Sequence, residues 1–81
     1  MSYFVYIVEC SDATLYTGIT KDLYKRIEEH NTSDKGAKYT KYRRPVKLIY
    51  SEKSQDRSSA SKREYIIKKL TRKKKMDLIN A

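Results

Sequence analysis

The sequence predicts an α+β fold with the order β-β-α-β-α-α, in which a small three-stranded, mostly antiparallel sheet is flanked by helices. Segments rich in β-branched and aromatic residues alternate with segments that carry helix caps and apolar residues at helical spacing. The chain has 81 residues, enough for one domain with one modest core. Two glycines and one proline are too few for a fibrous or disordered chain. We therefore expect a single domain over residues 1–81.

The first twenty residues are predicted to form a β-hairpin. Residues 3–10 are dense in β-branched and aromatic side chains and too short for a typical helix. Residues 11–13 have the composition of a turn, and strand composition resumes over residues 14–20. A third strand is expected at residues 46–52, directly after Pro45.

The first helix follows the hairpin. Thr20 and Asp22 are both suitable N-caps, and Leu23 and Ile27 provide apolar residues at helical spacing. We expect this helix to end near residues 31–33.

Two further helices follow the third strand. Asp56 or Ser58 is expected to cap a helix whose apolar residues include Ile66 and Ile67. Thr71 interrupts that helix and can cap a last one over residues 72–79.

The charge is distributed unevenly along the chain. Nineteen Lys and Arg oppose ten Asp and Glu, for a formal net charge of +9. Residues 1–34 contain three basic and six acidic residues, whereas residues 35–81 contain sixteen and four. This imbalance indicates a polyanionic partner, and nucleic acid is the best candidate.

Several classes of protein are excluded. No run of about 18 apolar residues is present to span a membrane, and the N-terminus lacks the features of a secretory signal. One cysteine, Cys10, and one histidine, His30, provide neither an internal disulfide nor a zinc site. We expect a cytoplasmic protein that does not associate with membranes.

Residues 34–44 have no apolar periodicity and predict a long ordered loop with a function, because loops of this length in compact domains are usually functional or disordered. Residues 35–47 carry six positive charges and no acid, and residues 62–75 carry eight against Glu64 alone. Cations interleaved with tyrosines suit phosphate contacts and stacking on bases, although a solvated, solubilising surface is the alternative. The predicted nucleic-acid-binding residues are Lys35, Lys38, Tyr39, Lys41, Tyr42, Arg43 and Arg44.

Two polar residues of the first helix are candidates for chemistry. His30 is placed near the buried face, and Arg26 lies on its margin, where a guanidinium can hold a phosphate at the lip of a cleft. Spacing alone favours a simpler interpretation, with a solvated Arg26 beside Glu29 and a histidine stabilised by the helix dipole.

The hairpin offers a second group. If even-numbered residues pair across the two strands, Tyr6 and Tyr16 share one face beside the gap left by Gly18. Two tyrosines beside such a gap can bind a phosphate or a water, but tyrosines are also common strand residues.

Glu64 lies on the flank of the apolar stripe of its helix. A carboxylate there can bind a hard cation such as Mg²⁺, which typically takes one or two protein carboxylates. The alternative is an ion pair with Lys68, four residues further on.

The order of these residues resembles the GIY-YIG nuclease superfamily. The resemblance is carried by Val5-Tyr6-Ile7, a gap of eight residues, Tyr16-Thr17-Gly18, Lys25-Arg26 and His30-Asn31. The chain is similar, more narrowly, to the small stand-alone bacterial GIY-YIG proteins, through Leu15-Tyr16-Thr17-Gly18-Ile19-Thr20, Gly36-Ala37-Lys38-Tyr39-Thr40, Arg43-Arg44-Pro45-Val46, Arg63-Glu64-Tyr65 and Ile67-Lys68-Lys69-Leu70. The ordered set covers nearly the whole chain, and it reverses the simpler interpretations of the single residues.

The resemblance implies a GIY-YIG-type fold and a role for each candidate. Tyr6 and Tyr16 match the two motif tyrosines, of which one helps to activate the attacking water and the other orients it or the scissile phosphate. Arg26 matches the arginine that stabilises the pentavalent phosphate. His30 matches the general base or its support, and Glu64 matches the single acidic ligand of Mg²⁺ or Mn²⁺.

The function implied is that of a metal-dependent endonuclease, which hydrolyses phosphodiester bonds in DNA, more than in RNA, on a repair or recombination-type substrate. Val5 stands where the first motif has glycine, Thr17 stands where the second has isoleucine, and Asn80 is the only candidate for a late asparagine that many relatives place near the site. The alternative is a nucleic-acid-binding module with the same fold and little or no catalysis, or a basic protein associated with RNA. The sequence predicts no oligomeric state.

Overall fold

The computed structural model describes residues 2–33 and 35–81. In this part of the chain, the strands β1 (Tyr3–Glu9), β2 (Leu15–Thr20) and β3 (Lys47–Ser54) form one antiparallel sheet in the order β2-β1-β3. The central place of β1 agrees with its composition, because residues 5–8 are all buried. The predicted α+β fold with a three-stranded sheet is confirmed.

The helices of the described residues are α1 (Leu23–Thr32), α2 (Lys38–Lys41), α3 (Arg57–Lys68) and α4 (Arg72–Ile79). Asp22, and not Thr20, caps α1 by accepting a hydrogen bond from the backbone N–H of Lys25 at 3.1 Å. Asp56, and not Ser58, caps α3 through the N–H of Ser59 at 2.8 Å. The three predicted helices are therefore present, and short carboxylate caps decide where two of them begin.

The segment predicted as a loop over residues 34–44 contains the one-turn helix α2, which the predicted order lacks. Residue 34, at the start of that predicted loop, lies outside the described residues. A helix of four residues is too short to show an apolar period, so the sequence pattern gave no sign of it.

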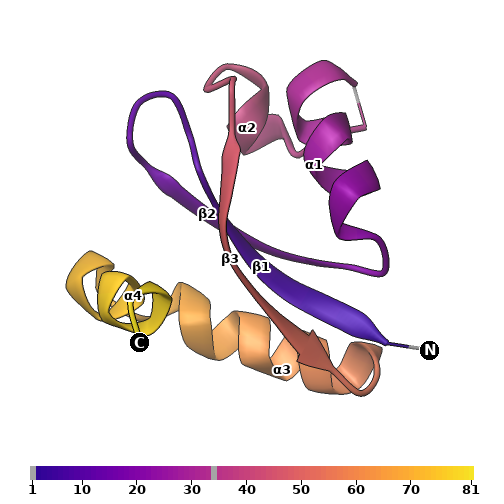
Figure 1. The fold of residues 1–81 in the computed structure, drawn as a ribbon, viewed down its shortest axis with the longest axis vertical. Coiled ribbons are helices and arrows are strands. Elements are labelled where there is room, and N and C mark those ends of the chain that lie inside the picture. The colour runs from indigo at the N-terminus through magenta and orange to yellow at the C-terminus, as the bar shows by residue number, and fades with distance from the viewer. Residues whose placement is uncertain (1, 34) are drawn as a thin grey trace.

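The helices lie on both faces of the sheet, with α1 and α2 on one face and α3 and α4 on the other (Figure 1). Successive side chains of a strand point to opposite faces. The even-numbered residues Tyr6 and Val8 therefore join the core beneath α1, and Val5 and Ile7 join Ala60 and the rest of the core beneath α3.

The register of the hairpin places both motif tyrosines on the face that α1 covers. Tyr6 is opposite Gly18 and Val8 is opposite Tyr16, so even-numbered residues pair across the strands as the sequence analysis required. Since β2 is an edge strand, groups from both helical layers can approach this part of the sheet. Within the described residues, no helix has the length and apolar character needed to cross a membrane.

Candidate active site

His30, in the last turn of α1, is the centre of a buried hydrogen-bonded chain. Its side chain is fully buried. Its Nε2 lies 2.7 Å from the hydroxyl of Tyr6, and its Nδ1 lies 2.8 Å from Oγ1 of Thr40 in α2. The chain thus connects the sheet, α1 and α2 through one imidazole.

The partners of Thr40 assign the proton positions in this chain. The hydroxyl of Thr40 donates its single hydrogen to the backbone oxygen of Ala37 at 2.9 Å, which leaves an Oγ1 lone pair facing His30. In the tautomer we propose, His30 donates Nδ1–H to Thr40 and its unprotonated Nε2 accepts the hydroxyl hydrogen of Tyr6. The backbone N–H of Ala37 also points to Nδ1, at the longer distance of 3.4 Å. Tyr6 is the donor at the end of the chain nearest β2.

The environment keeps both members of the Tyr6–His30 pair neutral at pH 7. Burial, with the positive charge of Arg26 as the next cause, lowers the pKa of His30 from 6.5 to about 4. Burial raises the pKa of Tyr6 to about 12. Both side chains are therefore uncharged at pH 7.

Gly18 allows the phenol of Tyr6 to lie against β2. A Cβ atom at position 18 would be 2.5 Å from the Tyr6 hydroxyl oxygen and 2.7 Å from Cζ, so no larger residue fits without moving the ring. The gap predicted at Gly18 is filled by the ring of Tyr6. Glycine at this position serves the placement of Tyr6.

Tyr16 is held between two aromatic neighbours. Its ring meets His30 edge-on with the centroids 5.3 Å apart, and it stacks on Tyr39 at 5.9 Å. The guanidinium of Arg43 lies 4.1 Å from the centroid of Tyr39, and it binds a carboxylate oxygen of Asp12 at 3.1 Å. The predicted base-stacking residue Tyr39 therefore supports Tyr16.

Arg26 lies at the margin of α1, as its spacing predicted, with about a quarter of its side chain exposed. It contacts a carboxylate oxygen of Glu29 at 3.2 Å and the backbone oxygen of Lys35 at 2.8 Å. Burial of Tyr6 has the largest influence on the pKa of Tyr6 and raises it. The hydrogen bond and the positive charge of Arg26 come next, and both lower that pKa. The guanidinium thus faces the Tyr6 hydroxyl while other residues hold it.

Glu64 lies on α3, which packs on β1 and β2 from the other layer. Burial is the main cause of the raised pKa of Tyr6, and the negative charge of Glu64 contributes to it in the same direction. The alternative ion pair is present, since Lys68 Nζ lies 3.5 Å from a carboxylate oxygen of Glu64. The neighbouring Arg63 is committed elsewhere, to Glu52 at 3.0 Å.

The surroundings of Glu64 fit a hard divalent cation. Among residues 2–33 and 35–81 no three His, Cys, Asp or Glu side chains gather as a metal cluster. A site with one carboxylate is what Mg²⁺ uses when water and substrate phosphate complete its coordination. The Glu64 side chain is 23% exposed and its partner Lys68 is 52% exposed, so the carboxylate is accessible.

The predicted nucleic-acid-binding residues fall into two groups. Arg44 donates to the backbone oxygens of His30 and Ser33, both at 2.6 Å, and so binds the end of α1. Tyr39 and Arg43 form the stack described above. The exposed members of the predicted set are Lys35, Lys38, Lys41, Tyr42 and Tyr39 itself, with Tyr42 81% exposed and Tyr39 40% exposed.

Sequence reasoning assigned no role to Thr40, Gly36 or Asn31. A Cβ at Gly36 would lie 2.7 Å from the backbone oxygen of Glu29, so glycine lets the segment before α2 pack on α1. The side-chain amide of Asn31 binds the backbone of Val46. It accepts a hydrogen bond from the N–H at 2.7 Å and donates one to the carbonyl oxygen at 3.1 Å. The signal was present in the family motifs over residues 30–31 and 36–40, which contain these three residues but gave them no role.

The three departures from the family pattern lie away from the Tyr6–His30 pair. Val5 is fully buried in the core beneath α3, and Thr17 lies opposite Ile7 on that same face. Asn80 is exposed at the C-cap of α4. The two substituted motif positions therefore pack the opposite face of the sheet.

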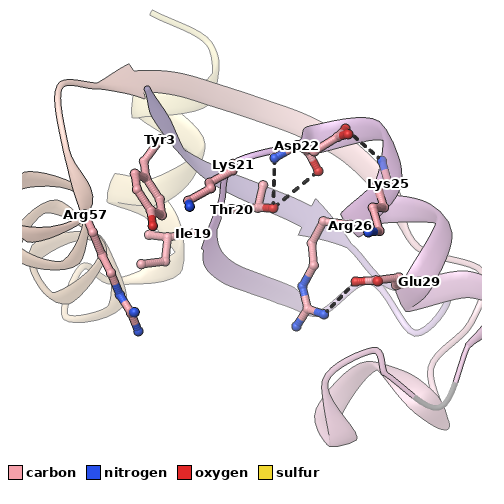
Figure 2. Close-up of a pocket in the computed structure, with 9 residues that line it drawn as sticks. All are labelled: Tyr3, Ile19, Thr20, Lys21, Asp22, Lys25, Arg26, Glu29 and Arg57. Carbon is pink, nitrogen blue, oxygen red and sulfur yellow. Dashed lines mark hydrogen bonds and ion pairs between the residues drawn. The ribbon is translucent and has the colours of Figure 1, made fainter. Parts of the chain in front are cut away.

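An open pocket of about 410 Å³ adjoins the site on the side of Arg26 (Figure 2). Residues from β1, β2, α1 and the start of α3 line it. Arg26 is the only one of the five candidate catalytic and metal residues among its lining residues. The pocket therefore lies beside the Tyr6–His30 pair and does not enclose it.

Residues 2–77 match the family described as the GIY-YIG catalytic domain. A UPF0213 protein of Desulfotalea psychrophila is 59% identical over 80 residues, which cover 99% of this chain and 73% of that protein. A UPF0213 protein of Staphylococcus aureus strain N315 is 59% identical over 78 residues, which cover 96% and 94%.

Two structures solved by solution NMR are similar along the chain. The UPF0213 protein BH0048 from Bacillus halodurans is 42% identical with a TM-score of 0.63, and the protein EF2693 from E. faecalis is 43% identical with a TM-score of 0.68. Each comparison covers 99% of this chain and 84% of the solved one. With a buried tyrosine–histidine pair, a marginal arginine and an accessible glutamate in the expected order, the chain belongs to the GIY-YIG catalytic domain family.

Proposed function

We propose that this chain is an endonuclease that uses Mg²⁺ or Mn²⁺ to hydrolyse phosphodiester bonds in DNA, on a repair or recombination-type substrate. One observation supports this most strongly. The hydroxyl of Tyr6 donates to a neutral buried histidine while the charges of Arg26 and Glu64 both act on it. A cation for the phosphate, a carboxylate for the metal and an acceptor for a proton then serve one reaction centre.

Tyr6 is the group that contacts the attacking water. Its hydrogen points to His30 and Arg26 hydrogen-bonds to its oxygen, so the second lone pair of this oxygen, in a side chain that is 1% exposed, is the one proposed to accept a hydrogen bond from water. As the water oxygen bonds to phosphorus, the P–O ester bond breaks and the leaving oxygen takes a proton from solvent, while the water proton passes to Tyr6 and the original Tyr6 proton passes to His30 Nε2. The tyrosine stays neutral throughout, which suits its pKa of about 12.

His30 acts as the support of the base. It is completely buried, so it reaches the water only through Tyr6. Its pKa of about 4 keeps it neutral at physiological pH and lets it release the proton after each turnover. General acid–base assistance of this kind contributes about 10²–10⁴-fold to rate.

Arg26 and Tyr16 orient and stabilise the reacting phosphate. A guanidinium that is already held by Glu29 and Lys35 needs no reorganisation when negative charge grows on the phosphate oxygens. Tyr16, fixed by its ring neighbours, positions the phosphate or the water.

Glu64 is the residue that would hold the metal. An exposed ion pair such as Glu64–Lys68 contributes little free energy, so a divalent cation replaces the lysine at small cost. When bound, Mg²⁺ would withdraw charge from the phosphate and the leaving oxygen. The exposed cations Lys35, Lys38 and Lys41, together with Tyr42, are proposed to contact the DNA outside the reaction centre, and a cytoplasmic location stays a prediction.

The test is a cleavage panel over duplex, single-stranded, flap and junction DNA with Mg²⁺ or Mn²⁺. Wild type is compared with Arg26→Ala and Glu64→Ala, and with Glu28→Ala as the control for loss of an exposed helical carboxylate. We expect each site variant to lose at least about 10²-fold in rate and the control to cleave like wild type.

Two outcomes contradict the proposal. Cleavage that survives both site substitutions identifies a contaminating nuclease. Strong DNA binding by wild type, with no cleavage of any substrate, identifies a binding module that keeps the fold.

A further inference from the structure

The pocket beside Arg26 has a charge that its sequence neighbourhood does not predict. Residues 1–34 are net acidic and contain only three basic residues, Lys21, Lys25 and Arg26. All three line this pocket, and Arg57 joins them from the first turn of α3. The fold thus gathers four cations around one opening.

The acids at this pocket are already engaged. Asp22 uses its carboxylate to cap α1, and Glu29 is paired with Arg26. Within residues 2–33 and 35–81, by contrast, the side-chain cations of Lys21, Lys25 and Arg57 are in no ion pair. Three cations are therefore available to an anion that enters the pocket.

The lining also provides an aromatic surface. The ring of Tyr3 is half-buried, with the Lys21 ammonium 5.5 Å from its centroid. Figure 2 shows Arg57 and Tyr3 on one side of the pocket, Arg26 on the other, and Ile19 and Thr20 between them. A phosphate with an attached sugar and base matches both kinds of surface, whereas a free phosphate would leave the ring unused.

The dimensions agree with a ligand of that size. A volume of about 410 Å³ lies within the usual range of about 300–1,000 Å³ for small-ligand sites. Because Arg26 belongs to both the pocket and the reaction centre, a strand whose scissile phosphate lies at Arg26 passes directly into this pocket.

We propose that the pocket binds the nucleotide that adjoins the scissile phosphodiester, with the cations Lys21, Lys25 and Arg57 distributed around its phosphate groups and Tyr3 against its sugar or base. This assignment rests on the proposed function, since it names a place for the substrate strand. Most of the lining residues of this binding position belong to residues 1–34, the net acidic part of the chain.

The first test measures binding apart from cleavage. A fluorescently labelled single-stranded oligothymidylate is titrated with protein in EDTA, followed by anisotropy, between about 50 and 200 mM salt. Lys21→Ala and Arg57→Ala are compared with Lys53→Ala, which removes an exposed cation that lies outside the pocket and outside both basic segments.

We expect Lys21→Ala and Arg57→Ala each to lower the slope of log K against log salt by about 0.7, the value for one phosphate contact on a single strand. Lys53→Ala should keep the wild-type slope. In a second readout, the 5′-phosphorylated thymidine dinucleotide should shift the amide NMR signals of residues 19–21 and 25 in wild type, and those shifts should shrink in Lys21→Ala.

The outcomes separate this inference from the proposed function. If wild type binds and cleaves but both pocket variants keep its slope, the pocket assignment is wrong and the nuclease proposal stands. If the dinucleotide shifts the pocket amides but wild type cleaves nothing, the pocket stands and the nuclease proposal fails. If wild type binds neither probe, both are wrong.

Discussion

Two buried threonines on opposite faces of the sheet differ sharply in how their hydroxyls are satisfied. Thr40, on the α1 side, accepts a hydrogen bond from His30 and donates one to the backbone oxygen of Ala37. Thr17, on the α3 side, is 3% exposed, and its Oγ1 is the one buried side-chain polar atom without a partner among the described residues.

This contrast separates a face organised for chemistry from a face organised for packing. Buried polar groups are normally paired, because an unpaired one costs about 1–3 kcal/mol. Beneath α1 the polar groups form one continuous chain that ends at Tyr6. Beneath α3 the neighbours Val5, Ile7 and Ile67 are apolar, and the hydroxyl of Thr17 serves no contact in the structure.

The largest expected effect concerns the histidine of the paired face. The folded-state pKa of His30, about 4, lies below its usual 6.5, so the unfolded chain binds more protons between these values. The stabilisation is complete above about pH 6.5 and is lost as the pH falls toward 4, by about 3 kcal/mol at pH 4. Urea unfolding at pH 7 and pH 4 measures this loss.

His30→Gln is the control, because it cannot titrate while the carboxylates, which titrate in the same range, are unchanged. Wild type should lose about 3 kcal/mol more than this variant over the interval. An equal loss in both proteins would show that burial of His30 does not shift its titration.

The next effect tests Thr40 itself. Thr40→Val keeps the shape but removes the side-chain partner of His30 Nδ1, while the oxygen of Ala37 keeps the backbone N–H groups of Thr40 and Lys41, so we expect a loss of about 1–3 kcal/mol in the free energy of unfolding. Thr40→Ser restores the hydroxyl. It should recover most of the stability and the Nδ1-protonated state of His30, which ¹⁵N NMR of the ring reports.

The pairing of Thr40 with His30 would be refuted if Thr40→Val kept both the stability and the ring ¹⁵N shifts of wild type. A loss in Thr40→Ser as large as in Thr40→Val would also contradict it, since both variants would then act through packing alone.

The smallest effect is expected on the packing face and has the opposite sign. Thr17→Val removes an unpaired hydroxyl from an apolar core without changing the shape, so it should raise the free energy of unfolding by about 1 kcal/mol. DNA cleavage should be unchanged, because Tyr6 points to the other face. Urea unfolding and cleavage rates measure the two results, and a destabilised Thr17→Val would show that the hydroxyl does find a partner.

The same two faces explain how much of the molecule the sequence could predict. The strands of the hairpin and the cap Thr71 follow from local composition. The caps Asp22 and Asp56 and the even-numbered register are each one of two alternatives that the sequence pattern leaves open. These features depend on residues that are close together in the sequence, so the sequence pattern can indicate them.

The site itself depends on contacts across the fold. No spacing rule connects His30 with Thr40 ten residues later, and the four-residue helix that carries Thr40 shows no periodicity. Pattern reasoning interpreted the gap at Gly18 as empty because it could not place the ring of Tyr6 from the opposite strand. The family resemblance named Tyr6, Tyr16, Arg26, His30 and Glu64, but only the fold showed that His30 is buried and bonded to the hydroxyl of Tyr6.

The most direct measurement is the rate of metal-dependent DNA cleavage by Tyr6→Phe, with Tyr24→Phe as the control because Tyr24 is 89% exposed on α1. Removing the Tyr6 hydroxyl takes away the acceptor for the water proton and keeps the ring against Gly18. We predict a loss of about 10²-fold or more in rate, with DNA binding retained and the control at the wild-type rate. A folded Tyr6→Phe protein that cleaves DNA as fast as wild type would contradict the proposed reaction centre.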